Sequence, residues 1–382
     1  MWDCAYKKVR TGCRGPETVS RKNRTNRLER SGEGQYTARA VEIEVRGNVP
    51  ARILSLVIAL CVLVAAPCNA APLSKVRVTP AAGERYLSLK DVASAYGLTL
   101  RVPLGKKVYL QGKWNSWSFE VDSRQASFNG TIVWLLSPMT KYRGKWMITE
   151  SDAREIVDPL MRPYAYIGAR GYRVVVLDPG HGGPDTGARG RRGVEEKRVV
   201  LDVAMRARVH LANAGLKVYL TRETDRFIEL DDRGIKAARW GADAFVSIHL
   251  NSAPGSVPRG LETYVLSNVG YPSTASAARS RGDRTAYSGN RFEHSNTVLG
   301  YFMQKALLEK AKGEDRGLRR ARFMVLRNAP CPAALVECGF LSHAGEEKLM
   351  LDAKHREAIA LAISKGIIDY FNAVKKARVS AP

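Results

Sequence analysis

The sequence predicts an α/β fold: a mostly parallel sheet flanked by helices, preceded by a small α+β domain. From residue 173 onward, short apolar runs alternate with helix-length amphipathic segments, as they do in βαβ units. Residues 73–165 instead hold closely spaced stretches of alternating polarity, which is typical of hairpins. With 382 residues and 45% hydrophobic content, the chain has room for two domains and a full core.

The first 71 residues differ from a folded domain. Residues 1–50 are rich in Arg, Gly, Thr and Glu and lack a sustained apolar period, so we interpret them as a disordered or mis-annotated extension. Residues 51–71 read as a secretory signal peptide, because the apolar run Ile53–Ala66 follows Arg52 and precedes small residues. We therefore expect translation to start near residue 45 or 49. The alternative is a long N-terminal tail with an uncleaved anchor, although the run is short for a membrane span.

Residues 73–165 are expected to form the small α+β domain. Tyr86–Leu98 gives a short strand and then an amphipathic helix, and Asn129-Gly130 is a strong hairpin signal. The other expected elements are strands at Lys107–Leu110, Trp117–Val121, Gln125–Phe128, Thr131–Leu135 and Met147–Thr149, and a closing helix at Glu150–Leu160. The pattern resembles a small N-terminal domain of some copper amine oxidases and several bacterial envelope proteins. The segment has no histidine, so the resemblance does not imply copper chemistry. A wall-binding or partner-binding role and a plain packing role both stay open.

Residues 170–375 are expected to form the second domain, after a linker at residues 162–172. Predicted strands are Arg173–Leu177, Lys217–Leu220, Ala244–His249, Leu261–Val265, Arg322–Leu326 and Ala333–Val336. Predicted helices are Val199–Ala214, Asp231–Trp240, Thr297–Lys312 and Ala353–Tyr370. The polar interval Asn268–Asn296 is rich in Gly and Ser, so we expect a surface loop there.

The net charge of +24 favours polyanionic partners such as nucleic acid, anionic lipid or anionic envelope polymers. A secretory signal argues against nucleic acid, and a basic surface also serves solubility alone. Cys331 and Cys338 flank the predicted strand Ala333–Val336, which holds them too far apart for a disulfide. The sequence therefore predicts neither a disulfide framework nor a cysteine-based zinc site.

Three predicted strands end on groups that can carry chemistry. His181 follows the first strand, His249 ends the third, and Glu337 follows the last. The pair Glu195-Glu196 stands just before the first long helix, near the same sheet edge. Each residue alone has an ordinary structural role, but the carboxyl ends of parallel strands meet at one edge and form ligand sites there. Two histidines and a carboxylate are the ligands of hydrolytic zinc sites, and a second carboxylate supplies a general base.

Five ordered motifs within residues 173–372 strengthen this interpretation. They are Val176–Gly183 with Asp185–Ala188, Glu196-Lys197, Thr221–Asp225, Ser247–Asn251 and Pro332–Ser342. Together they resemble the zinc-dependent N-acetylmuramoyl-L-alanine amidases of bacterial cell walls. The resemblance implies that His181, Glu196 and His249 hold Zn²⁺ and that Glu337 is the catalytic residue. Glu196 is preferred over Glu195 because the motif is Glu followed by Lys.

The resemblance implies hydrolysis of the amide bond between N-acetylmuramic acid and L-alanine in peptidoglycan. With a cleaved signal peptide, the protein would be exported to the periplasm or cell envelope and keep no stable membrane span. A zinc peptidase acting within the stem peptide and a non-catalytic wall-binding protein are the alternatives. Asp178 and Asn251 are candidates for orienting ligands or substrate. Regulated members of this family carry an inhibitory helix between the residues that correspond to His249 and Glu337. We expect no such helix here, because the polar loop Asn268–Asn296 in this interval has no sustained apolar face. The sequence does not indicate a protein activator.

Overall fold

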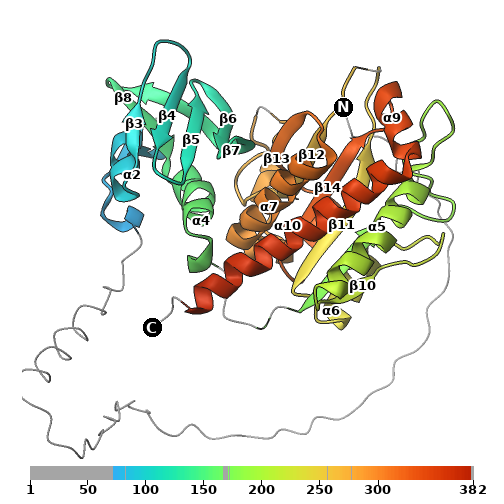
Figure 1. Ribbon diagram of the computed structural model, residues 1–382. Helices are drawn as coiled ribbons and strands as arrows, with labels where there is room; N and C mark the ends of the chain where they lie inside the picture. The colour runs from blue at the N-terminus through green and yellow to red at the C-terminus, as the bar shows by residue number, and fades with distance from the viewer. Residues whose placement is uncertain are drawn as a thin grey trace, which may run out of the picture. The chain divides into compact units, whose positions relative to one another are not determined.

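The computed structural model describes residues 72–81, 83–166, 171, 173–255, 257–276 and 278–379 (Figure 1). The expected extension, the signal peptide and part of the linker lie outside these residues. The described residues belong to one compact unit, so the two expected domains can be considered together. Within them, no helix combines the length and apolar character that a membrane crossing requires.

The second domain is built on a mixed sheet. Its strands are β9 (Val174–Pro179), β10 (Lys217–Leu220), β11 (Ala244–Asn251), β12 (Leu261–Leu266), β13 (Asp315–Ala321) and β14 (Ala333–Phe340). They lie in the order β10-β9-β11-β14-β12-β13. All neighbours pair in parallel except β12 and β14, which are antiparallel. The predicted fold class, a mostly parallel sheet flanked by helices, is confirmed.

Helices cover both faces of this sheet. On one face lie α5 (Glu196–Asn213), α7 (Glu293–Ala311) and α10 (Ala353–Val379), which cross in front of the strands in Figure 1. On the other face, α6 (Leu230–Arg239) and α8 (Met324–Arg327) cover the early parts of the central strands. Successive side chains of a strand point to opposite faces of the sheet and so contribute to both hydrophobic cores. Val175 packs in the core under α5, α7 and α10, and Val176 packs in the core under α6 and α8. The late parts of β11 and β14 carry polar side chains on the second face.

The small domain is an antiparallel meander with short helices. Its elements are η1 (Pro72–Lys75), β1 (Val78–Ala81), β2 (Glu84–Ser88), α2 (Leu89–Ala95), β3 (Thr99–Arg101), β4 (Lys107–Gln111), β5 (Ser116–Glu120), β6 (Ser123–Phe128), β7 (Thr131–Tyr142), β8 (Lys145–Thr149), α3 (Glu150–Asp152), η2 (Ala153–Val157), α4 (Asp158–Met161) and η3 (Pro163–Ala165). Asn129 and Gly130 both have positive φ, at 47° and 84°, as the predicted tight hairpin requires.

The small domain joins the sheet of the second domain through β7. Val133 on β7 pairs in parallel with Leu318 on β13, so the strand order continues β13-β7-β6-β5-β4-β3. The backbone N–H of Ile132 donates a 2.7 Å hydrogen bond to Asp315 Oδ2, which fixes the two edges together. The two halves therefore share one hydrogen-bonded sheet.

One predicted strand is wrong. The segment Arg322–Leu326 runs into the short helix α8, and the true strand β13 lies just before it, at Asp315–Ala321. Three arginines make β13 look like a polar loop, yet their side chains find acceptors, as when Arg320 donates to the carbonyl of Trp134 at 3.0 Å. The predicted loop Asn268–Asn296 is also shorter than expected, because it holds η4 (Arg281–Arg284) and η5 (Ser288–Phe292), and α7 begins at Glu293.

Candidate active site

The first predicted ligand, His181, lies in a tight loop at the end of β9. Its φ of 59° is in the left-handed region, which is uncommon for a residue with a side chain. The preceding Gly180 passes directly against His249: a Cβ there would lie 2.3 Å from the His249 ring. Only glycine at this position lets the loop bring the two histidines together.

The three predicted ligands converge on one point. Glu196 Oε1, at the start of α5, lies 3.2 Å from His181 Nε2 and 3.0 Å from His249 Nδ1. One ligand atom from each of the three residues lies within 4.8 Å of the ligand atoms of the other two. Glu195, the rejected neighbour, instead pairs with Arg198 at 3.2 Å. Two imidazoles and a carboxylate in this arrangement form a donor set that fits a zinc ion.

The orientation of His181 depends on Asp185, a residue that the sequence interpretation did not single out. Asp185 Oδ2 lies 2.8 Å from His181 Nδ1. Since a carboxylate only accepts, Nδ1 carries the proton, and Nε2 is the nitrogen that faces Glu196. The other oxygen of Asp185 accepts the N–H of Gly187 at 3.1 Å. The signal available in the sequence was that Asp185 lies only four residues after His181, close enough for a contact between the two side chains within one loop.

Glu196 is buried with both oxygens engaged. Oε1 accepts the N–H of Leu250 at 2.9 Å, and Oε2 accepts the N–H of Ala188 at 2.8 Å. Burial would raise the pKa of Glu196, but its close contacts with the His181 and His249 rings hold the pKa well below the ordinary value. The side chain is therefore ionised, as a metal ligand must be.

Glu337 lies beside this cluster on β14. It is the register partner of His249 on β11, so both side chains point to the same face of the sheet. Its Oε2 is buried and finds no hydrogen-bond partner among the described residues. Burial raises the pKa of Glu337 well above its usual range, and the charges of Glu196 and Glu262 raise it further. A buried carboxyl with an unmatched oxygen is costly, which makes Glu337 a candidate for a chemical role.

Two buried arginines hold the loop that carries His181. Arg222 donates to the carbonyl oxygens of Pro179 and Gly180, and Arg233 donates to those of Pro179 and His181. Arg233 also forms a 2.8 Å ion pair with Asp178, which is fully buried. Asp178 thus anchors the strand end through Arg233 and is not itself directed at the ligand cluster.

Asn251, the other candidate for orienting ligands, bonds away from the cluster. Its Nδ2 donates to Glu262 Oε1 at 2.5 Å, and its Oδ1 accepts the N–H of Ser252 at 2.7 Å. Glu262 lies opposite Glu337 in the antiparallel pair of β12 and β14. Asn251 is therefore part of the surroundings of Glu337 and not of the three ligands.

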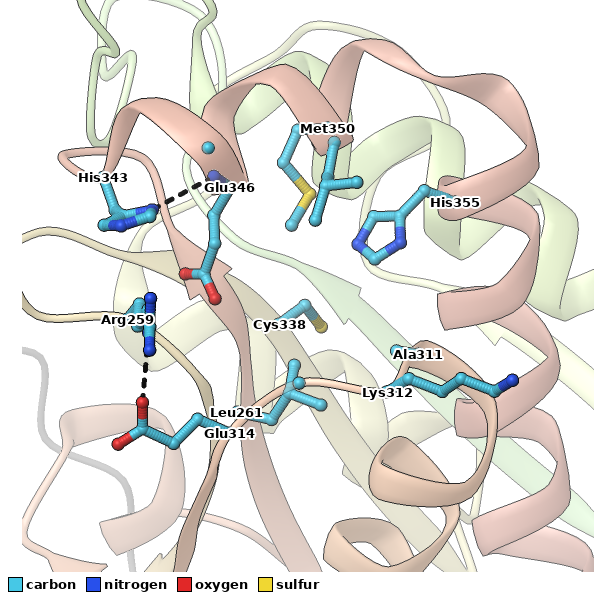
Figure 2. Close-up of a pocket in the computed structure, with 13 residues that line it drawn as sticks. Arg259, Leu261, Ala311, Lys312, Glu314, Cys338, His343, Glu346, Met350 and His355 are labelled. Atoms are coloured by element: carbon cyan, nitrogen blue, oxygen red, sulfur yellow. Dashed lines mark hydrogen bonds and ion pairs between the residues drawn. The ribbon is translucent and has the colours of Figure 1, made fainter.

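A separate cavity lies on the opposite face of β14. It has a volume of about 450 Å³, and Figure 2 shows Cys338, Met350 and His355 around it. Cys338 follows Glu337 directly, so alternation points its buried thiol away from the histidine cluster. The lining residues include none of His181, Glu196, His249 and Glu337. The cavity is therefore distinct from the candidate active site.

Comparison with known proteins identifies the catalytic half. The N-acetylmuramoyl-L-alanine amidase family matches residues 175–369. The chain belongs to this family. The amidase AmiA of Escherichia coli K12 is 38% identical over 223 residues, which cover 53% of this chain and 77% of AmiA. The sporulation-specific amidase of Bacillus subtilis 168 is 32% identical and covers 53% of this chain and 69% of its own length.

Solved structures of amidases also match. The catalytic domain of CwlV, an amidase of Bacillus (Paenibacillus) polymyxa var. colistinus, is 33% identical, with a TM-score of 0.44. The match covers 53% of this chain and 99% of that domain. The family match over residues 175–369 and the identity to AmiA confirm the family predicted from the sequence and the enzyme class, an N-acetylmuramoyl-L-alanine amidase. The family match begins after the small domain.

Proposed function

We propose that this amidase is a zinc-dependent hydrolase that cleaves the bond between N-acetylmuramic acid and L-alanine in peptidoglycan. The observation that carries the proposal is the convergence of Glu196 Oε1 with His181 Nε2 and His249 Nδ1, at 3.2 and 3.0 Å. Beside them, Glu337 keeps a buried carboxyl oxygen that the described residues leave unpartnered. Three ligands and one separate carboxyl are the components of a hydrolytic metal site.

The ion would be held by His181, Glu196 and His249. When bound, zinc acidifies a water molecule and withdraws electrons from a carbonyl oxygen. Asp185 keeps the proton of His181 on Nδ1, so that Nε2 presents its lone pair. The donors Leu250 N–H and Ala188 N–H hold the Glu196 carboxylate in place.

Glu337 would move the protons. Its carboxylate accepts a proton from the attacking water as the water oxygen bonds to the lactyl carbonyl carbon. It then returns that proton to the nitrogen of L-alanine as the carbon–nitrogen bond breaks, which leaves a free amine and a lactyl carboxylic acid; the acid then loses its remaining proton to solvent and becomes the carboxylate. A raised pKa suits this exchange, because it makes the carboxylate of Glu337 a stronger base toward the attacking water.

We further propose that the protein acts in the periplasm or cell envelope, where its substrate lies. The predicted signal peptide at residues 51–71 supports export, although it falls outside the described residues. The net charge of +24 favours contact with anionic envelope polymers in addition to the glycan and peptide of the wall.

Product analysis tests the proposal. Purified sacculi are digested with the enzyme, with and without a chelator, and the new chemical ends are identified. We expect lactyl carboxylates together with N-terminal L-alanine, loss of both with chelator, and recovery with added Zn²⁺. New amino termini inside the stem peptide would instead establish a peptidase. Undiminished cleavage after verified metal removal would contradict the zinc mechanism.

A further inference from the structure

Charged side chains continue from Glu337 across the sheet toward the small domain. Glu262 on β12 is the register partner of Glu337 on β14. Two residues further along β12, Tyr264 is the register partner of Arg319 on β13. Since residues two apart on a strand share a face, Glu337, Glu262 and Arg319 all point to the same side of the sheet.

Glu262 is a buried carboxylate with a full set of partners. Only 1% of it is exposed. Its Oε2 accepts from Arg319 Nη1 at 2.8 Å and from Arg316 Nε at 3.1 Å, and its Oε1 accepts from Asn251 Nδ2 at 2.5 Å. Like charges on directly opposite strand residues repel, and the two guanidinium groups reduce, without removing, the repulsion that Glu262 exerts on Glu337.

The outer side of this arginine pair is formed by the small domain. The guanidinium of Arg319 lies 5.2 Å from the centre of the Trp134 ring, within the range of a cation–π contact. Trp134 Nε1 donates to the carbonyl of Arg316 at 3.0 Å, and the carbonyl of Trp134 accepts from Arg320 Nη1 at 3.0 Å. One residue of β7 therefore holds β13 at three points.

We propose that Trp134 is a positioning residue of the amidase reaction. Through Arg319 it holds Glu262 ion-paired and fixed beside Glu337, so that the small domain completes the catalytic unit. The proposal rests on the proposed role of Glu337 as the proton carrier. It differs from a packing role, because packing alone would change how much protein is folded and not how fast each folded molecule turns over.

Steady-state kinetics on a soluble muramoyl peptide separate the two roles. The full chain is assayed with saturating Zn²⁺ as wild type, W134F, W134A, R319Q and the double variant W134A/R319Q. Trp114 provides the matched control, because it lies in the same domain and is 80% exposed. Rates are expressed per mole of folded enzyme, and melting temperatures are recorded for every variant.

We expect R319Q to lower kcat about tenfold or more, since small displacements of catalytic groups cost that much, with KM within about twofold of wild type. W134A is expected to lower kcat severalfold, and W134F to recover most of it, because phenylalanine still stacks on a guanidinium. The double variant should resemble R319Q alone, because Trp134 acts through Arg319. Trp114→Ala should match wild type.

Unchanged kcat in W134A with only a lower melting temperature would overturn the proposal, as would additive losses in the double variant. If W134A does not fold, W134F and R319Q still decide: a normal kcat in R319Q overturns it. Failure of the proposed function has a different signature, because the wild type itself would then release no lactyl carboxylate.

Discussion

The catalytic half and the small domain share one sheet but use buried charge in opposite ways. In the small domain, Asp152 is fully buried, and its oxygens accept from Thr149 Oγ1 and from the N–H groups of Leu136 and Ser137. In the catalytic half, Glu337 keeps one buried oxygen with no partner among the described residues. Both carboxyls have a pKa raised by burial, to about 6 for Asp152 and well above the usual range for Glu337.

The difference teaches how to separate a structural carboxyl from a functional one. Hydrogen bonds from Thr149, Leu136 and Ser137 partly counteract the effect of burial on Asp152. At Glu337 the neighbouring charges of Glu196 and Glu262 act in the same direction as burial. A saturated buried carboxyl stabilises a fold, whereas an unsaturated one between other carboxylates costs stability and is retained for its reactivity.

The largest expected effect tests this contrast at Glu337. Glu337→Gln keeps the shape of the side chain but cannot carry a proton, so we expect kcat to fall about 10²–10⁴-fold, the usual contribution of a general acid–base group. Zinc content should equal that of wild type, because Glu337 is not among the three converging ligands. Turnover on muramoyl peptide and metal analysis of the same sample provide the measurement.

Asp152→Ala is the matched variant in the small domain. It leaves three donors without their acceptor, and each buried unsatisfied donor costs about 1–3 kcal/mol, so we expect lower stability toward urea. Turnover per folded molecule should change far less than in Glu337→Gln. A Glu337→Gln variant with near-normal turnover would remove the contrast altogether.

A smaller effect is expected at Asp185, which fixes the proton of His181 on Nδ1. Asp185→Ala removes the 2.8 Å contact and should weaken zinc affinity or activity about 10–100-fold, as is usual for residues that orient metal-bound histidines. Competition with a chromogenic chelator measures the affinity. Asp185→Asn is the graded control, since its amide oxygen can still accept from Nδ1. Equal affinity in both variants and wild type would assign Asp185 to loop structure alone.

The sequence predicted most of the catalytic half because its strands are continuous apolar runs that end on conspicuous residues. The bounds of β10 agree with the prediction, β11 runs two residues beyond the predicted strand to Asn251, and β14 runs four residues beyond its predicted strand, from Glu337 to Phe340. His181, His249 and Glu337 were found because each ends or follows such a run, and Glu196 because it stands just before the first long helix and matches the family motif; the structure places the four side by side. Their roles stay predictions until tested.

What the sequence could not predict depends on pairing between distant residues. Strand β13 was missed because Arg316, Arg319 and Arg320 look like loop residues until their acceptors on β12 and β7 are known. The role of Asp185 depends on the left-handed backbone at His181, which brings the two side chains together. The shared sheet edge between β7 and β13 gave no local signal, since a strand pair is a property of two segments.

The smallest expected effect concerns the contact between the two halves at His294. His294 Nε2 on α7 lies 2.8 Å from Glu155 Oε2 in η2 of the small domain. Burial lowers the pKa of His294, but the hydrogen bond and charge of Glu155 outweigh it and raise the value above 6.5. The pair therefore stabilises the fold fully below pH 6.5, and this contribution is lost as the pH rises through the raised pKa. Because the His294 side chain is 37% exposed, solvent screening keeps the contribution below about 1 kcal/mol.

Urea unfolding of wild type and His294→Gln at pH 5.5 and pH 9 should show a stability difference that is larger at the lower pH. A difference that is the same at both pH values would mean that the contact between the halves does not depend on the charge of His294.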